Sequence, residues 1–210
     1  MAMTLYSGFV GSGKSYHATR EGIRFADASF GGGWVLANFP IKPKKSLFGF
    51  GKTETRWIFK RNEEFSPKLL IDLSREHGWD KKENSCMLIF DEAGILFNAR
   101  DWAKNRDRMA WIQFFSQSRK LGYDIIFVAQ DARMLDRQIR SLCEYEITHR
   151  KMNNWSIFQL LPMTTFACIK YWNGMNARYA KGSLSLSIYR KSIADRYDTN
   201  ALFGYDEKVK

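Results

Sequence analysis

The stretch SGFVGSGKSYH, residues 7–17, decides the fold of this chain. It holds the spacing Gly8-x-x-x-x-Gly13-Lys14-Ser15, which is the complete P-loop pattern. The run Thr4–Ser7 before it predicts a short strand, and a helical pattern begins at Lys14. Glycines allow the backbone N–H groups of such a turn to surround phosphate oxygens, and the helix N-terminus adds a favourable dipole. The stretch therefore predicts a site for a nucleoside triphosphate.

The positions of this motif have separate expected roles. The ammonium group of Lys14 would reach the β- and γ-phosphates, and the hydroxyl of Ser15 would bind Mg²⁺. ATP and Mg²⁺ are therefore the expected cofactors. The residues expected to contact the nucleotide are Gly8, Gly11, Ser12, Gly13, Lys14, Ser15 and Tyr16.

An acidic pair follows a second apolar run. Cys86–Phe90 (CMLIF) predicts a buried strand, and Asp91 and Glu92 come directly after it. Open α/β sheets bind ligands at the carboxyl ends of their strands, so Asp91 is a candidate metal ligand together with Ser15. Glu92 would polarise the attacking water, which favours a hydrolase over a kinase. The other interpretation is an acid pair at a turn or at the start of a helix.

Gln130 follows a third apolar run, Asp124–Ala129 (DIIFVA). We expect this strand to lie beside Cys86–Phe90, where the amide of Gln130 would contact the γ-phosphate or orient water. The alternative is a turn residue that faces solvent.

Arginines recur at helical spacing in the segment Asp131–Leu142. Of Arg133, Arg137 and Arg140, the last is the candidate arginine finger, which would act on the phosphate of a neighbouring subunit. An equally good interpretation is a solvated basic helix face that pairs with nearby aspartates.

Strands and helices alternate through residue 150. This predicts an α/β fold of the P-loop NTPase class, with a mostly parallel sheet of the additional-strand, catalytic-glutamate type and helices on both faces. The expected strands are 4–7, 34–37, 86–90, 124–129 and 144–148, and the expected helices start at Lys14, Pro67, Arg106 and Asp131.

Two parts of the chain depart from this alternation. Residues 41–61 are basic and predict an inserted loop or hairpin, with Arg56–Lys60 as a strand. In the last third, Trp155–Leu160 and Phe166–Tyr171 predict an antiparallel pair around Pro162, with a further strand at 184–189 and a polar tail. We therefore expect a core at 1–150 and antiparallel strands and a tail at 151–210, packed on the same domain.

The charge balance favours an anionic partner. The chain has 33 Lys and Arg against 22 Asp and Glu among 210 residues, a net charge of +11. Basic residues and aromatics interleave in two clusters, which fits single-stranded nucleic acid or an anionic membrane surface, although solvated loops would look the same. The clusters comprise Lys42, Lys44, Lys45, Lys52, Arg56, Lys60 and Arg61, then Arg100, Lys104, Arg106 and Arg108, with Phe48, Phe50, Trp57 and Trp102.

Cysteine and histidine spacing indicates no further site. Cys86, Cys143 and Cys168 lie far apart beside apolar runs, so we expect buried free thiols. His17, His77 and His149 show no metal-binding or triad spacing, and we expect them at a helix surface or a strand end. The N-terminus lacks a secretory pattern and no stretch is apolar enough to span a membrane, so we expect a soluble chain.

Taken together, these segments resemble the zonula occludens toxin N-terminal domain family, the assembly ATPases of filamentous phages, which are related to the FtsK–HerA group. The matching segments are GFVGSGKS at 8–15, VLANFPI at 35–41, LIFDEAG at 88–94, SRKLGYDIIFVAQ at 118–130, DRQIRSLCE at 136–144 and YDT at 197–199.

The resemblance implies a Mg-dependent ATPase at the cytoplasmic face of the host inner membrane. It would power filamentous-phage morphogenesis and export, with coat protein replacing single-strand-binding protein on the genome. Expected partners are copies of the chain itself, a hexamer among the candidates, other phage assembly proteins or a membrane-anchored partner, phage single-stranded DNA and an anionic membrane surface. One departure is Arg119-Lys120, where many relatives have Arg-His.

Three other functions stay open on the residues alone. They are a DNA-translocating or DNA-packaging ATPase of the FtsK–HerA type, a small-molecule kinase, and a nucleotide-gated binding protein with negligible turnover. Asp91-Glu92 argues against the kinase. Asn38 lies in a region that often faces the purine base of the nucleotide.

Overall fold

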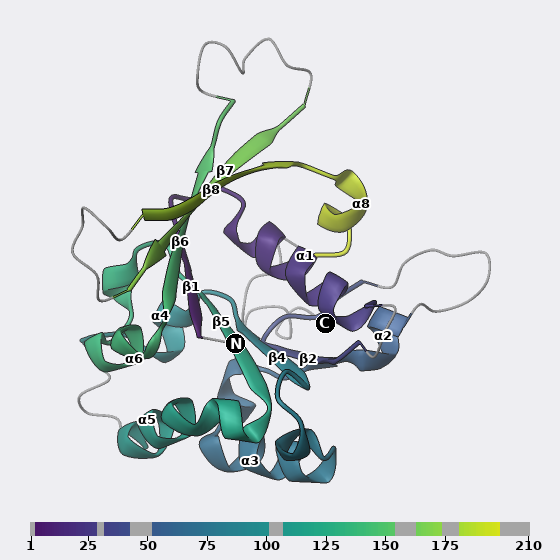
Figure 1. The fold of residues 1–210 in the computed structure, drawn as a ribbon, viewed down its shortest axis with the longest axis vertical. Coiled ribbons are helices and arrows are strands. Elements are labelled where there is room, and N and C mark those ends of the chain that lie inside the picture. The colour runs from purple at the N-terminus through teal and green to yellow at the C-terminus, as the bar shows by residue number, and fades with distance from the viewer. Residues whose placement is uncertain are drawn as a thin grey trace, which may run out of the picture.

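The computed structural model describes residues 3–28, 32–42, 52–100, 107–153, 163–173 and 181–197. One eight-stranded sheet runs through these residues in the order β3-β2-β4-β5-β1-β6-β7-β8 (Figure 1). The strands are β1 (Thr4–Ser7), β2 (Trp34–Ala37), β3 (Trp57–Phe59), β4 (Cys86–Phe90), β5 (Tyr123–Val128), β6 (Tyr145–Lys151), β7 (Thr165–Trp172) and β8 (Lys181–Ile188).

The sheet has a parallel part and an antiparallel part. All neighbours from β3 to β6 run parallel, whereas β7 and β8 extend the sheet as antiparallel strands. β5 lies between β1 and β4, which is the additional-strand arrangement expected from the sequence. The mostly parallel α/β fold with antiparallel strands in the last third is therefore confirmed.

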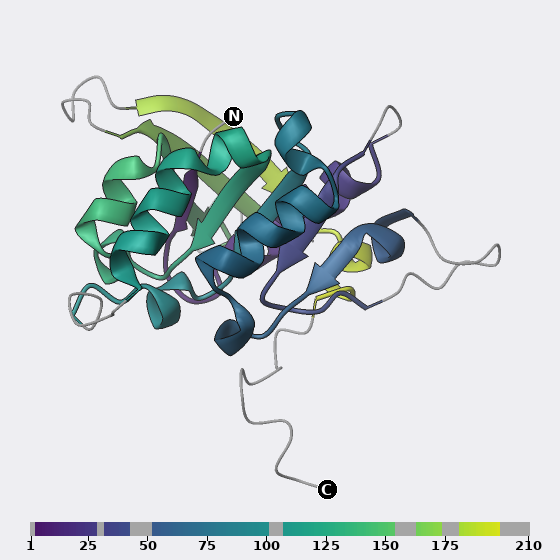
Figure 2. The same ribbon diagram turned by 90° about the horizontal axis from the view of Figure 1, so that it is seen from below.

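Helices cover both faces of the sheet. One face carries α1, and the other carries α3 and α5 (Figures 1 and 2). The α-helices are α1 (Lys14–Ala26), α2 (Lys52–Arg56), α3 (Pro67–Glu76), α4 (Ala93–Leu96), α5 (Arg108–Gln117), α6 (Arg137–Leu142) and α8 (Lys191–Ala194); the short 3-10 helices are η1 (Asn62–Glu64), η2 (Trp79–Lys81), η4 (Ser118–Leu121) and η5 (Ala132–Met134).

Apolar packing on both faces holds the site-bearing strands in place. All five residues of β4 and all six of β5 are buried, as expected for parallel strands covered on both faces. On the α3 and α5 face, the rings of Phe90, Phe97 and Phe127 pack together. On the α1 face, Gly22 allows close approach, since a Cβ there would lie 2.8 Å from the ring of Trp57.

Local sequence signals set several element ends. The hydroxyl of Ser66 accepts from the N–H of Leu69 at 3.2 Å, and Pro67 opens α3, as predicted. The segment predicted as one helix over 106–121 consists of α5 and η4 in its described part, and it ends at Gly122 with φ 76°.

One helix prediction was wrong, and two strand predictions had other outcomes. Residues 131–142 form η5 and α6 rather than one helix, because Asp131 and Asp136 each cap a new helical segment with their carboxylates. The antiparallel partners of β7 are β6 and β8, while Trp155–Leu160 lies outside the described residues. The strand expected at Arg56–Lys60 is present as the shorter β3, which pairs parallel with β2.

Candidate active site

The P-loop forms a cradle at the carboxyl edge of the sheet, between β1 and α1. Gly8, Gly11 and Gly13 have φ angles of 142°, 75° and 89°, which glycine adopts without strain. A Cβ at Gly13 would lie 2.9 Å from the ring of Phe166. The Ser12 hydroxyl is buried and has no hydrogen-bond partner among the described residues, although buried polar groups are nearly always paired. The loop fits a ligand that accepts hydrogen bonds, such as phosphate.

Lys14 lies inside this cradle. Its side-chain nitrogen donates to the carbonyl of Phe9 at 3.1 Å, and the residue is 6% exposed. Burial lowers the pKa of Lys14, while the carboxylates of Glu92 and Asp91 oppose that shift. Nearby negative charge therefore stabilises the protonated form of Lys14, and a bound triphosphate would add to that charge.

Ser15 and Asp91 meet as the sequence predicted. The Ser15 hydroxyl donates to Asp91 Oδ1 at 3.0 Å, although the two residues come from α1 and from the end of β4. Burial raises the pKa of Asp91, and hydrogen bonds from Tyr197, Ser15 and the Glu92 N–H oppose that shift. Hydroxyl and carboxylate oxygens are ligands that Mg²⁺ prefers, so this pair fits the ion.

Tyr197 is a site residue that our prediction did not include. Its hydroxyl donates to Asp91 Oδ2 at 2.5 Å, and its ring packs edge-on against Phe39. The segment that carries it is tied to the loop after β2, since Lys42 N–H donates to the Arg196 carbonyl at 2.8 Å. The motif YDT at 197–199 was the only available signal, and it did not reveal this contact.

Asn38 fixes the backbone of Asp91. Its amide donates to the Asp91 carbonyl and its Oδ1 accepts from the Asp91 N–H, both at 2.7 Å. The residue is 2% exposed, and its amide also donates to Asn62 at 2.9 Å. Both ends of the Asn38 carboxamide therefore bind the protein, so this side chain does not face a purine, although it lies in a region that often does.

Glu92 has an unusual backbone. It lies in the left-handed region at φ 48° and ψ 47° and precedes α4. Non-glycine residues rarely adopt this conformation, and such outliers gather at functional sites. Its N–H donates to Asp91 Oδ1 at 3.1 Å, so the two acidic residues are held as a unit.

Gln130 also lies at this edge of the sheet. Its carbonyl accepts from the Gly8 N–H at 3.2 Å, and the residue itself is exposed. β5, which precedes Gln130, pairs with β4 as expected. The side chain is therefore available beside the P-loop.

Arg140 is not brought to the P-loop of its own chain. Its guanidinium donates to the Ala132 carbonyl at 3.4 Å, and its own carbonyl accepts from Asn173 at the opposite edge of the sheet. Within the described residues, no hydrogen bond or ion pair joins Arg140 to Lys14, Asp91 or Gln130. Its expected role toward a neighbouring subunit stays a prediction.

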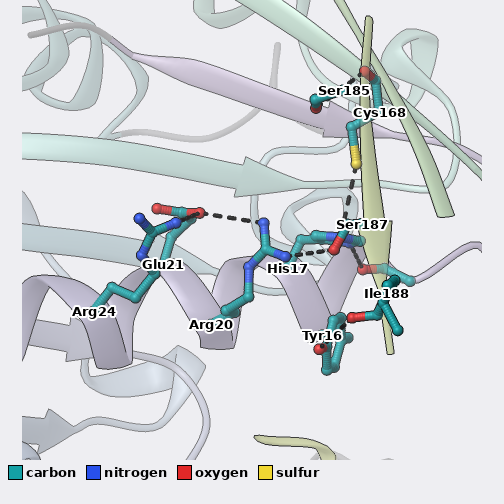
Figure 3. A network of polar contacts seen from close by, with 10 residues as sticks. Tyr16, His17, Arg20, Glu21, Arg24, Cys168, Ser185, Ser187 and Ile188 are labelled. Carbon is teal, nitrogen blue, oxygen red and sulfur yellow. Dashed lines mark hydrogen bonds and ion pairs between the residues drawn. The ribbon is translucent and has the colours of Figure 1, made fainter. Parts of the chain in front are cut away.

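Tyr16 uses its hydroxyl to connect α1 with the end of β8. The hydroxyl donates to the Ile188 carbonyl at 3.4 Å and accepts from the Arg190 N–H at 2.9 Å. Figure 3 shows Tyr16 and Arg20 reaching from α1 toward this strand, where Arg20 bonds to Ser187. The Tyr16 hydroxyl is therefore already bound to the protein, and the predicted contact of Tyr16 with a nucleotide stays a prediction.

Several residues of the basic clusters have structural partners. Arg56 donates to the carbonyls of Ala26 and Gly32, and Trp57 donates to the Phe39 carbonyl at 3.2 Å. Arg108 bonds to Gln138 at 2.9 Å. Residues 43–51 and 101–106, with most of the other members, lie outside the described residues. The Trp57 ring is therefore held against the loop after β2, and binding of nucleic acid or membrane by these clusters stays a prediction.

The cysteines and one histidine follow expectation, whereas two histidines do not. All three cysteines are buried and free, and His77 is exposed. His17 and His149 were predicted at a helix surface or a strand end; His17 lies on α1 and His149 near the end of β6, but both are buried, at 2% and 1% exposed. In the described ranges, no helix has the length and apolarity needed to cross a membrane.

Comparison with known families agrees with this architecture. A model of the Zonular occludens toxin (Zot) family matches residues 2–201. The Gene 1 protein of Enterobacteria phage M13 is 27% identical over 225 residues, which cover 100% of this chain and 63% of that protein. The Gene 1 protein of Escherichia phage If1 is 26% identical over 97% of this chain and 60% of its own length. The chain thus spans less than two thirds of these relatives.

Solved structures share the fold. The N-terminal domain of zonular occludens toxin from Neisseria meningitidis has a TM-score of 0.53 at 20% identity, with 94% of this chain and 98% of that chain covered. The genome packaging NTPase B204 from Sulfolobus turreted icosahedral virus 2, solved in complex with ATP-gammaS, has a TM-score of 0.54 at 15% identity, covering 90% and 97%. These comparisons bear out the predicted fold. The chain belongs to the Zot family.

Proposed function

We propose that this chain binds ATP with Mg²⁺ in the P-loop and hydrolyses it to drive phage assembly. The observation that carries the proposal is the meeting of Ser15 and Asp91 at 3.0 Å, with Glu92 held beside them at the carboxyl edge of the sheet. A P-loop alone indicates only nucleotide binding. An acidic residue next to the metal-binding aspartate favours transfer of the phosphoryl group to water.

Different residues of the site would have separate roles in binding and hydrolysis. The N–H groups of the P-loop and Lys14 would bind the phosphates, and Ser15 and Asp91 would hold Mg²⁺, which neutralises charge on the phosphate oxygens when bound. Glu92 would accept the proton of the attacking water while that oxygen bonds to the γ-phosphorus and the β–γ bridging bond breaks. Tyr197 would orient the Asp91 carboxylate through the 2.5 Å hydrogen bond.

The substitution Glu92→Gln tests hydrolysis apart from binding. It removes the proton acceptor and keeps the side-chain size, so we expect kcat to fall by about 10²–10⁴-fold. Affinity for a non-hydrolysable ATP analogue should change by less than a few-fold, because Glu92 is not expected to bind the phosphates. Glu76→Gln, on the exposed surface of α3, is the matched control. If wild type and Glu92→Gln hydrolyse ATP equally slowly, Glu92 has no catalytic role, and the chain would instead be a nucleotide-gated binding protein with negligible turnover.

The biological role follows from the family. Relatives that match this chain are Gene 1 proteins of phages M13 and If1, and the Zot family is the one that the sequence motifs resembled. We infer that hydrolysis powers morphogenesis and export of a filamentous phage at the cytoplasmic face of the host inner membrane. The chain would work there as a homo-oligomer, with Arg140 as the candidate residue acting on a neighbouring copy.

A second candidate is a DNA-packaging or DNA-translocating ATPase. Two observations favour it: the fold is shared with a genome packaging NTPase, and the net charge of +11 suits an anionic track. The two functions differ in the cargo that should stimulate hydrolysis. Single-stranded DNA or anionic membrane would stimulate an assembly ATPase, whereas duplex DNA would stimulate a translocase.

A further inference from the structure

A second polar cluster lies beneath the P-loop. It consists of His17 on α1, His149 on β6 and Cys168 on β7, which are 2%, 1% and 8% exposed. Their candidate ligand atoms all lie within 4.8 Å of one another. Figure 3 shows His17 and Cys168 facing each other across the boundary between α1 and the antiparallel strands.

Backbone carbonyls orient both imidazole rings. His17 Nδ1 lies 2.6 Å from the Gly13 carbonyl oxygen, and His149 Nδ1 lies 3.0 Å from the Ile147 carbonyl oxygen. Because a carbonyl oxygen can only accept, Nδ1 of His17 carries the proton that it donates to Gly13, which leaves the lone pair on its Nε2. The His149 ring donates to the Ile147 carbonyl, and the Ser7 carbonyl is a second acceptor close to that ring. Metal-binding histidines are commonly oriented in this way, with the second nitrogen donating to a carbonyl or carboxylate.

Two distances in the cluster match a zinc centre. His17 Nε2 lies 3.7 Å from Cys168 Sγ, and zinc–ligand bond lengths at tetrahedral angles place such atoms about 3.6 Å apart. The ring centroids of His17 and His149 are 4.9 Å apart, against about 5 Å for two imidazoles on one zinc ion. The candidate ligand atoms of all three residues lie within 4.8 Å of one another, so a displacement of about 1 Å would bring them to the separations that a zinc ion requires.

We propose that His17, His149 and Cys168 form a binding site for a zinc ion. Two imidazoles and a thiolate are a ligand set that suits Zn²⁺ and does not suit Mg²⁺. Binding would replace the thiol proton of Cys168 with the metal and release that proton to solvent. The ion would join α1, β6 and β7 directly behind Gly13, and so would hold the P-loop helix to the added strands.

The ionisation of the three groups agrees with this geometry. Burial lowers the pKa of His17 to about 4 and that of His149 to about 3, so both rings are neutral near pH 7. Burial raises the pKa of the Cys168 thiol to about 11. Metal binding would therefore be favoured by higher pH, with one proton released per ion.

Titration of the metal-free protein with Zn²⁺ and with Co²⁺ tests the site, in the presence of excess Mg²⁺. We expect one ion per chain and a rise in melting temperature, together with a thiolate-to-cobalt charge-transfer band in the near ultraviolet. Cys168→Ser should abolish the band and weaken Zn²⁺ binding by at least about 100-fold, and His149→Gln should weaken it by at least about 10-fold. Cys143→Ser, which replaces another buried thiol, should leave both unchanged.

A measurement on the wild-type chain keeps the proposal testable if the variants fail to fold. X-ray absorption at the zinc edge should show one sulfur at about 2.3 Å and two imidazole nitrogens at about 2.0 Å. Failure of the wild type to bind Zn²⁺ stoichiometrically would overturn the proposal. So would a bound ion with no sulfur ligand, or a cobalt band that survives in Cys168→Ser.

Discussion

Two buried aspartates at opposite edges of the sheet differ in what surrounds them. Asp91 follows β4 at the carboxyl edge and is 1% exposed, whereas Asp124 lies near the start of β5 and is 5% exposed. Asp91 accepts from two hydroxyls and a backbone N–H. At Asp124 the neutral side-chain amide of Asn84, when its nitrogen is oriented toward the carboxylate, would donate at 3.1 and 3.2 Å to the two oxygens.

Burial alone therefore does not identify a functional carboxylate. Burial raises the pKa of both groups, and that of Asp124 reaches about 6. At Asp91 three hydrogen bonds to the charged form oppose the shift. Asp91 therefore has donors arranged around its charged form, which suits the Mg²⁺ site proposed above, whereas burial dominates at Asp124.

Asp91→Asn should have the largest effect. The change removes the charge that would hold Mg²⁺, so ATP turnover should fall by at least about 100-fold. The tighter binding of an ATP analogue in Mg²⁺ than in EDTA should also disappear. Steady-state phosphate release and calorimetric titration measure the two effects. Asp124→Asn, the same substitution at the other edge, should retain turnover; similar losses in both variants would refute the contrast.

Tyr197→Phe should have an intermediate effect. It deletes the hydroxyl that bonds to Asp91 and keeps the ring against Phe39. A hydrogen bond to a charged group contributes about 1.5–3 kcal/mol, which predicts a loss of about 10- to 100-fold in the Mg²⁺ affinity of the ATP-bound protein. Magnesium titrations of turnover and of analogue binding measure it. Tyr189→Phe, on the same segment, is the control. If both variants show the same Mg²⁺ dependence, the proposed role of Tyr197 in orienting Asp91 is contradicted.

Asp124→Asn should have the smallest effect, and a stabilising one. Because the pKa in the folded state exceeds the unfolded value of 3.8, wild type binds more protons when folded between about pH 4 and pH 6. Its stability therefore rises as pH falls through this window. The variant should be more stable than wild type by about 1–3 kcal/mol at pH 7, and this advantage should vanish near pH 4. Urea denaturation at both pH values checks this, and a pH-independent difference would contradict it.

Prediction from the sequence succeeded where the signal is local. The motif at Gly8–Ser15 and the apolar run before Asp91 each carry their meaning within a few residues, and the parallel topology then brings them together. The break before α6 had a local signal as well, since Asp131 and Asp136 are both N-cap residues, but helical arginine spacing concealed it.

Prediction failed where contacts depend on pairing between distant strands. His17, His149 and Cys168 are far apart in the chain, and they meet only because β6 pairs with both β1 and β7. Tyr197 reaches Asp91 only because the segment after β8 crosses α1. No spacing rule within one stretch of sequence reports such contacts, so the sequence predicted the histidines at a helix surface or a strand end and did not predict that two of them meet.

The proposal that ATP hydrolysis drives phage assembly is tested most directly by two measurements on the wild-type chain, its ATPase rate and its assembly state. Both are measured with Mg²⁺–ATP alone and with added single-stranded DNA, duplex DNA or anionic liposomes. We predict Glu92-dependent hydrolysis that rises with single-stranded DNA or liposomes, together with nucleotide-dependent assembly. Stronger stimulation by duplex DNA would favour a translocase instead. The account would be contradicted by a chain that stays monomeric with and without nucleotide and hydrolyses ATP at the same slow rate with single-stranded DNA, duplex DNA, liposomes or no addition.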